Sequence, residues 1–121
     1  MSKKILVVDD DPVVGILVNE YLSAHGFDIE VLTNGTDCLE RLRQELPDIL
    51  ILDLIMPDMT GVQVLQNIRS DSATKALPVI LMSADSHSDS LVGQYECTAD
   101  CYVEKPFDVR RILEAIRSLG A

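Results

Sequence analysis

The stretch from Asp48 to Gly61 (DILILDLIMPDMTG) limits the possible folds of this chain more than any other segment. The residues on both sides of a single carboxylate, Asp53, are apolar. A short apolar run rich in Ile and Leu is typical of a strand that is buried on both faces of a parallel sheet. Met56-Pro57 and Thr60-Gly61 then predict the end of the strand and a turn. We therefore expect Asp53 at the carboxyl end of a central strand, where open α/β sheets bind ligands.

Strand-like segments alternate with helix-like segments along the whole chain. The expected strands are Lys4–Val8, Asp28–Leu32, the segment that ends at Asp53, Pro78–Met82 and Cys101–Val103. The expected helices begin at Pro12 (with an Asp11 cap and a stop at Gly26), at Asn34-Gly35 (with a stop at Pro47), at Val62, at Ser86 and after Asp108. Five such alternations predict an α/β fold, a doubly wound five-stranded parallel sheet with five helices. Strand order 2-1-3-4-5, as in flavodoxin-like folds, is common for five strands.

Two of these helices carry more specific expectations. In the first, Val14, Leu17, Val18, Tyr21 and Leu22 repeat at helical spacing. The fourth, Ser86–Cys97, has few apolar residues, so we expect a short helix that packs poorly against the rest.

Length and charge limit the function classes. The 121 residues, 47% of them hydrophobic, predict one folded domain, residues 1–121, rather than a disordered chain. No apolar run approaches the ~20 residues of a membrane span, and acidic residues follow MSKKILVV at once, so we expect no signal peptide and a cytoplasmic location. The net charge of −10 argues against direct binding to nucleic acid and suits a cation or a basic partner.

The cysteines predict no metal site. Cys38, Cys97 and Cys101 are an odd number in a chain expected in the cytoplasm, which argues against a disulfide framework. A zinc site would need four convergent ligands, and His25 and His87 lie far from the cysteines in sequence. We interpret the three cysteines as small buried apolar residues.

Polar residues stand at four strand ends that this strand order brings together. These residues are Asp9, Asp10, Asp53, Ser83 and Lys105. Three carboxylates this close repel one another, and a hard divalent cation relieves that repulsion. The small number of carboxylates favours Mg²⁺, which keeps several waters. Mg²⁺ and the lysine would balance the three carboxylates and let the site accept an anionic phosphoryl group.

Four fragments of the chain, in order, resemble the receiver domain of two-component response regulators of the chemotaxis-regulator type. The fragments are ILVVDDDP, LDLIMPDMTG, PVILMSA and YVEKPF. The resemblance covers essentially the whole chain. It implies that Asp53 is the phosphoacceptor, whose carboxylate attacks the phosphohistidine of a sensor histidine kinase or a histidine phosphotransfer protein. It also implies a signalling domain that catalyses its own phosphorylation and dephosphorylation rather than an enzyme with a separate substrate.

The same resemblance implies roles for the surrounding residues. Asp10 would bind Mg²⁺ directly, Asp9 through water, and Ile55 through its backbone carbonyl. Lys105 and Ser83 would each contact a phosphoryl oxygen, which agrees with the dominance of positioning and charge neutralisation in phosphoryl transfer.

A conformational switch is also implied. Ser83 would move toward the phosphoryl group and Tyr102 would rotate inward behind it. The face built from the fourth helix, fifth strand and fifth helix would change shape for a downstream effector, and a homodimer could form through it. The Lys105-Pro106 peptide bond is cis in this family. The sequence departs from the commonest pattern in having Ser83 rather than Thr, with Ile55 and Asp85 at positions that tune phosphoryl lifetime.

Several alternatives remain open on the residues alone. Asp11 is better explained as a helix cap, and Tyr102 can be a core aromatic, a switch, or both. An Asp-nucleophile phosphohydrolase of the haloacid dehalogenase type needs a second Asp two residues after the first, where this chain has Ile55. A nucleotide or flavin site would need a Gly-rich or hydroxyl-rich loop where Asp9–Asp11 stand. An unphosphorylated adaptor would lack one of the site groups. Whether the chain acts alone, in a phosphorelay, or as part of a longer protein stays undecided.

Overall fold

The protein is described from a computed structural model that covers residues 3–83, 99–105 and 108–120. Its elements are β1 (Lys4–Val8), α1 (Pro12–Ala24), β2 (Asp28–Leu32), α2 (Gly35–Gln44), β3 (Ile49–Asp53), α3 (Gly61–Ser70), β4 (Val79–Ser83), β5 (Cys101–Glu104) and α5 (Val109–Ser118). The five predicted strands are confirmed, each within a residue or so of its expected bounds. The predicted helix at residues 86–97 and the Lys105-Pro106 bond lie outside the described residues. No helix of the described ranges is long and apolar enough to span a membrane.

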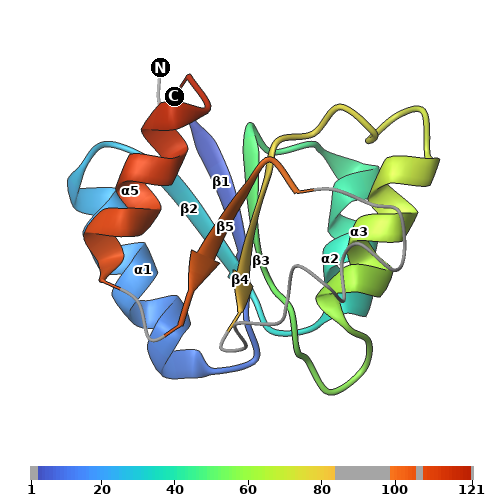
Figure 1. The fold of residues 1–121 in the computed structure, drawn as a ribbon, viewed down its shortest axis with the longest axis horizontal. Coiled ribbons are helices and arrows are strands. Elements are labelled where there is room, and N and C mark those ends of the chain that lie inside the picture. The colour runs from blue at the N-terminus through green and yellow to red at the C-terminus, as the bar shows by residue number, and fades with distance from the viewer. Residues whose placement is uncertain (1–2, 84–98, 106–107, 121) are drawn as a thin grey trace.

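All five strands are parallel, and their order in the sheet is β2-β1-β3-β4-β5 (Figure 1), which confirms the predicted doubly wound, flavodoxin-like topology. Val8 at the end of β1 lies opposite Leu52 of β3. The next residues along the two strands, Asp9 and Asp53, therefore stand at the same level of the sheet. The chain order reverses at this pair of neighbouring strands, which is where such sheets hold their ligands.

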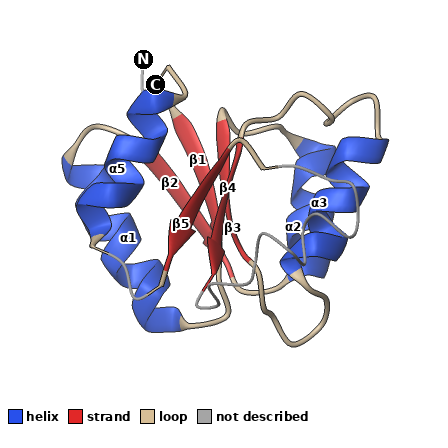
Figure 2. Ribbon diagram, viewed as in Figure 1, coloured by secondary structure: helices blue, strands red, loops and turns tan. Residues whose placement is uncertain are grey.

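Helices cover both faces of the sheet, with α1 and α5 on one face and α2 and α3 on the other (Figure 2). Because side chains alternate along a strand, each strand supplies both faces. The strands contribute Leu6, Val8, Leu50, Leu52, Val79 and Leu81 to the core under α2 and α3, and Ile5, Val7, Ile49, Ile51, Ile80 and Met82 to the core under α1 and α5. The central strands are buried on both faces, as their continuous apolar runs predicted.

The helix boundaries follow from local chemistry. The predicted caps are confirmed: Asp11 accepts a hydrogen bond from the N–H of Val13, and Asp108 accepts one from the N–H of Arg110. Gly26 follows α1 with a φ of +89°, a conformation that glycine adopts without strain. Leu17 shares the helical spacing of the apolar residues of α1, but its side chain is 52% exposed. It lies on the outer side of α1, while Val18 and Leu22 fill the core.

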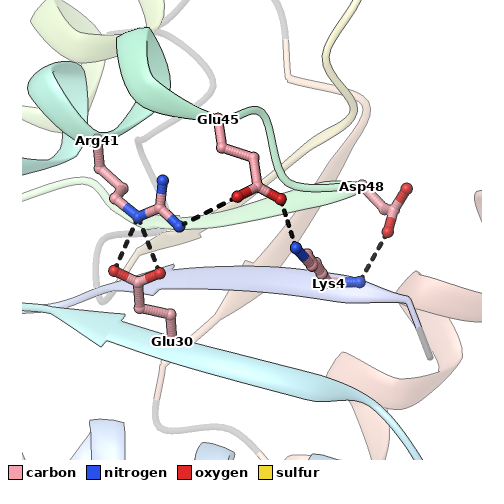
Figure 3. Close-up of polar contacts among 5 residues, drawn as sticks. All are labelled: Lys4, Glu30, Arg41, Glu45 and Asp48. Atoms are coloured by element: carbon pink, nitrogen blue, oxygen red, sulfur yellow. Dashed lines mark hydrogen bonds and ion pairs between the residues drawn. The ribbon is translucent and has the colours of Figure 1, made fainter.

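The amino-terminal edge of the sheet carries exposed polar contacts (Figure 3). The Lys4 side chain pairs with Glu45 after α2, and the Lys4 backbone N–H donates to Asp48 at 2.7 Å. Arg41 of α2 donates from Nε to the two carboxylate oxygens of Glu30 on β2, at 2.9 and 3.0 Å. Exposed ion pairs of this kind contribute little to stability, so the two apolar cores hold the fold together.

The cysteines agree in part with their predicted role. Cys38 is fully buried in the core under α2 and α3, and burial raises the pKa of its thiol to about 12. Cys101 on β5 is only partly buried. Cys97 lies outside the described residues. Cys38 is thus an inert packing residue, as predicted.

Candidate functional site

Three carboxylates meet at the carboxyl edge of the sheet. Asp9 and Asp10 follow β1, and Asp53 is the last residue of β3. One oxygen from each lies within 4.8 Å of the others. Asp9 is completely buried and Asp53 is 6% exposed, whereas Asp10 is exposed to solvent. The convergence predicted from the strand order is therefore present.

Lys105 reaches this cluster from the end of β5. Its Nζ donates to Asp9 Oδ2 at 2.6 Å and lies 3.3 Å from Asp53 Oδ1. The backbone N–H of Asp11 donates to the second Asp9 oxygen at 2.9 Å. Both oxygens of the buried Asp9 are thus satisfied, which a carboxylate without solvent contact requires. The lysine acts here as a counterion to two carboxylates.

The electrostatics of the cluster are set mainly by burial. Burial and the neighbouring charge of Asp9 raise the pKa of Asp53 to about 6, although the Lys105 ammonium and a backbone hydrogen bond from Ile55 act in the opposite direction. Burial lowers the pKa of Lys105, but the hydrogen bond to Asp9 and the charge of Asp53 outweigh it and raise that pKa overall. Among these residues, one ammonium leaves two of the three negative charges uncompensated.

The donor set fits a hard divalent cation. Carboxylate oxygens from three residues lie close enough together to share one ion, and Asp10 keeps the site open to solvent. A divalent charge would balance the two uncompensated charges of the cluster. The carboxylates can therefore hold a metal ion such as Mg²⁺.

The loop after Asp53 is held tightly against β3. The Leu54 N–H donates to the Met82 carbonyl of β4 at 2.8 Å, and the Gly61 N–H donates to the Leu54 carbonyl at 2.6 Å. A Cβ on Gly61 would collide with the backbone oxygen of Asp53 and lie 2.8 Å from Leu54 Cα. Glycine at 61 is thus what allows α3 to start directly beside the end of β3.

Sequence reasoning missed the function of Asp58, which it treated only as part of a turn. The Asp58 carboxylate accepts hydrogen bonds from the Gly35 N–H at 3.0 Å, the Thr36 N–H at 2.8 Å and the Thr36 hydroxyl at 2.6 Å. These bonds hold the pKa of Asp58 well below its ordinary value. Their partners are 22 and 23 residues away, so no local pattern could have revealed them.

The remaining predicted site residues lie just after β3, at the end of β4 and on β5. The Ile55 side chain is 65% exposed beside Asp53. Ser83 ends β4 opposite Glu104, one position beyond the level of Asp53, and its side chain lies outside the part of the chain that the structure describes. Tyr102 is 42% exposed, and its hydroxyl accepts from the Ala99 N–H at 3.4 Å.

A fold with this site matches one family of signalling domains. The model of the response regulator receiver domain family matches residues 5–117. The chain therefore belongs to this family: it is a phosphoacceptor receiver domain of the two-component type.

Relatives of known sequence give the same family. The chain is 35% identical over 118 residues to the DNA-binding response regulator MtrA of Mycolicibacterium smegmatis, covering 98% of this chain and 50% of that protein. It is 31% identical to the phosphate regulon transcriptional regulatory protein PhoB of Rhizobium meliloti, covering 98% and 52%. The chain thus spans about half the length of these relatives.

Solved structures agree with the fold. The response regulator TrrA of Thermotoga maritima, solved in complex with Mg²⁺-BeF, is 36% identical with a TM-score of 0.85, over 97% of this chain and 98% of that one. The bacteriophytochrome response regulator RtBRR is 30% identical with a TM-score of 0.85, over 100% and 80%. The chemotaxis response regulator CheY4 of Vibrio cholerae, at 24% identity and a TM-score of 0.88 over 98% and 99%, shares the fold.

Proposed function

We propose that Asp53 accepts the phosphoryl group. The observation that carries this proposal is the position of the Asp53 carboxylate, which ends β3 within 4.8 Å of two further carboxylates and 3.3 Å from the Lys105 ammonium. In the reaction, an Asp53 oxygen attacks phosphorus and the bond from phosphorus to the donor's imidazole nitrogen breaks. The electron pair stays on the imidazole, and an acyl phosphate forms on Asp53.

The neighbouring residues would bind the cation and contact the phosphoryl oxygens. Asp10, Asp53 and the backbone carbonyl of Ile55 would hold Mg²⁺ directly, and Asp9 would do so through water. The bound cation supplies charge neutralisation for the phosphoryl oxygens. Lys105, already 3.3 Å from Asp53, would pair with one phosphoryl oxygen, and the Ser83 hydroxyl would donate to another. The same groups would let the domain catalyse its own dephosphorylation by water.

The phosphodonor partner is a sensor histidine kinase or a histidine phosphotransfer protein. Three apolar side chains are exposed in the first two turns of α1, which begins two residues after Asp10: Val13 is 59% exposed, Ile16 58% and Leu17 52%. Ile55, beside Asp53, is 65% exposed. Apolar residues around a charged centre suit a protein surface that must deliver a phosphoimidazole to Asp53.

The output partner is a downstream effector domain or target protein, which would be reached through the face of β5 and α5, together with the helix that the sequence predicts at residues 86–97. Tyr102 on β5 is part of this face and would rotate inward with the movement of Ser83. A homodimer is a second way to use the face. We place the domain in the cytoplasm with no direct contact to membrane or nucleic acid, because its net charge is −10 and its phosphodonor is a cytoplasmic one.

Intact-mass measurement tests the phosphoacceptor. With Mg²⁺ and acetyl phosphate, the wild-type chain should gain one phosphoryl group, and Asp53→Asn should gain none. Asp11→Asn is the matched control, since Asn caps a helix as well as Asp does and Asp11 lies outside the carboxylate cluster. It should label like the wild type. Normal labelling of Asp53→Asn would remove Asp53 from the mechanism.

One observation weighs against a phosphohydrolase of the haloacid dehalogenase type. The position two residues after Asp53 holds Ile55, whose exposed apolar side chain cannot protonate a leaving group. An adaptor that is never phosphorylated would give no mass gain in the wild-type chain, so the same measurement decides that alternative.

A further inference from the structure

Asp58 belongs to the loop after β3 but caps a different element. Its two carboxylate oxygens accept hydrogen bonds from the backbone N–H groups of Gly35 and Thr36, the first two residues of α2. One of them also accepts from the Thr36 hydroxyl. These N–H groups have no partner inside the helix. The third N–H of α2, that of Asp37, donates a hydrogen bond to the side-chain oxygen of the local cap Asn34 at 2.8 Å. The start of α2 is therefore capped by two residues, one local and one from the loop.

The middle of this loop faces solvent, although both of its ends are fixed. The Leu54 N–H donates to Met82 of β4, the Gly61 N–H donates to Leu54, and Met56 is buried with 6% exposure. Ile55 lies between Leu54 and Met56, and its side chain is exposed to solvent. Its backbone is the part of the loop that the proposed function places at the cation. The position of that backbone depends on what holds the loop in place.

A second contact brings the loop against α2 at the same point. The side chain of Met59 packs so closely on Gly35 that a Cβ there would lie 2.7 Å from the Met59 sulfur. Gly35 is buried, and Met59 packs on the core under α2 and α3. The loop and the first turn of α2 thus form one packed unit, in which charge-assisted hydrogen bonds donated to the Asp58 carboxylate fix the position of the loop against the helix.

We propose that Asp58 is a positioning residue: by binding the first turn of α2, it fixes the loop that carries the Ile55 carbonyl and so preorganises the cation site. Residues that contact and orient a metal-binding group affect metal affinity without touching the ion themselves. The inference rests on the proposed function, because it assumes that the Ile55 backbone takes part in Mg²⁺ binding. Asp58 itself contacts neither the cation nor the phosphoryl group.

The test compares two cap variants of the same helix. Asp58→Ala removes the long-range cap, and Asn34→Ala removes the local one without touching the loop. Mg²⁺ affinity is measured by calorimetry on the intact chain, and amide hydrogen exchange is measured without metal at residues 54–60, apart from Pro57, which has no amide hydrogen. Thr36→Val, which keeps Asp58 and removes only one of its donors, is a milder variant that should remain folded if Asp58→Ala does not.

We expect Asp58→Ala to weaken Mg²⁺ binding by about three- to tenfold, less than loss of a group bound directly to a ligand. Exchange at Ile55 and Met56 should become faster in the same variant. Thr36→Val should shift both readouts in the same direction by a smaller factor. Asn34→Ala should lower the melting temperature but leave both readouts at their wild-type values.

Three outcomes would overturn the inference, and one of them would also overturn the proposed function. If the wild type binds Mg²⁺ and Asp58→Ala and Thr36→Val bind it equally well with unchanged exchange, Asp58 is a helix cap only and the proposed function stands. If the wild type itself does not bind Mg²⁺, the proposed cation site fails and the inference fails with it. An equal loss of affinity in Asn34→Ala would also contradict a specific effect of the loop.

Discussion

Asp53 determines the electrostatics of the site because it is a carboxylate at the end of a strand that is otherwise apolar. Burial opposes its ionisation, and Asp9 adds a like charge at the same level of the neighbouring strand. Lys105 offsets only part of this repulsion. The metal-free site is therefore under electrostatic strain, which a divalent cation would relieve.

This strain predicts a pH dependence of stability in the metal-free protein. The pKa of Asp53 is about 6 in the folded state and about 4 in an unfolded chain. The folded state therefore binds the Asp53 proton more tightly than the unfolded state does. The stabilisation that Asp53 contributes to the free energy of unfolding is complete below about pH 4 and is lost as pH rises to about 6. Asp53→Asn has no such proton, so it should be more stable than the wild type at pH 7.5 by about 1 to 2 kcal/mol. The two should be nearly equal at pH 4.

Urea unfolding of both proteins in the presence of a chelator measures this difference. The difference in the free energy of unfolding between the wild type and Asp53→Asn, followed against pH, reports the titration of residue 53 alone. Carboxylates with lowered pKa values, such as Asp108, affect both proteins alike. Adding Mg²⁺ at pH 7.5 should stabilise the wild type and leave the variant nearly unchanged. A gap that is constant from pH 4 to pH 7.5 would contradict the raised pKa.

At the scale of elements, the connection from β3 to α3 is the most tightly constrained part of the site. Gly61→Ala would place a methyl group against the backbone of Asp53 and Leu54, which cannot move without shifting β3. We expect a loss of about 3 kcal/mol in the free energy of unfolding, as for overpacking in a rigid core. Phosphoryl uptake should also fall, because the displaced backbone is that of the phosphoacceptor.

Gly26→Ala is the matched control. Gly26 has a φ of +89°, but a methyl group added there would meet no other atom within 4 Å, so the substitution should cost only about 1 kcal/mol through backbone strain. It lies outside the carboxylate cluster and should leave phosphoryl uptake unchanged. Equal losses of stability in the two alanine variants would contradict steric contact at Gly61 as the cause.

The elements themselves could be predicted because their signals are local. Apolar runs marked the central strands, and Asp11, Gly26 and Asp108 marked helix ends through hydrogen bonds and backbone conformation within a few residues. The exposure of Leu17 could not be predicted, because helical spacing alone does not say which side of α1 faces the sheet. Asp58 was missed, because its partners come from a distant helix.

The site was predictable to the extent that it follows from topology. Once β1 and β3 are neighbours, Asp9 and Asp53 must stand side by side. The direct pairing of Lys105 with the buried Asp9 was not foreseen, since burial of Asp9 depends on how the loops around it pack. The sequence predicted that the lysine would balance the carboxylates together with Mg²⁺ and contact a phosphoryl oxygen, but not that it would bond directly to Asp9.

At the scale of the whole molecule, two apolar cores pack on the two faces of the sheet, and three carboxylates meet at the carboxyl ends of β1 and β3. The net charge of −10 predicts that this chain by itself does not bind DNA, although relatives about twice its length are named DNA-binding response regulators. Fluorescence anisotropy with a labelled duplex should show no binding at low salt, with or without Mg²⁺. Binding that weakens steeply with added salt would show a basic contact surface and contradict this prediction.

Mapping the phosphoryl group to a residue tests the central claim most directly. After labelling with acetyl phosphate and Mg²⁺, borohydride reduction converts an aspartyl phosphate to homoserine, which peptide mass spectrometry locates in the chain. We predict homoserine at position 53, and none when Mg²⁺ is replaced by a chelator. Homoserine at position 9 or 10, or a phosphoryl group that resists reduction and stays on a hydroxyl side chain, would contradict the assignment of Asp53 as the phosphoacceptor.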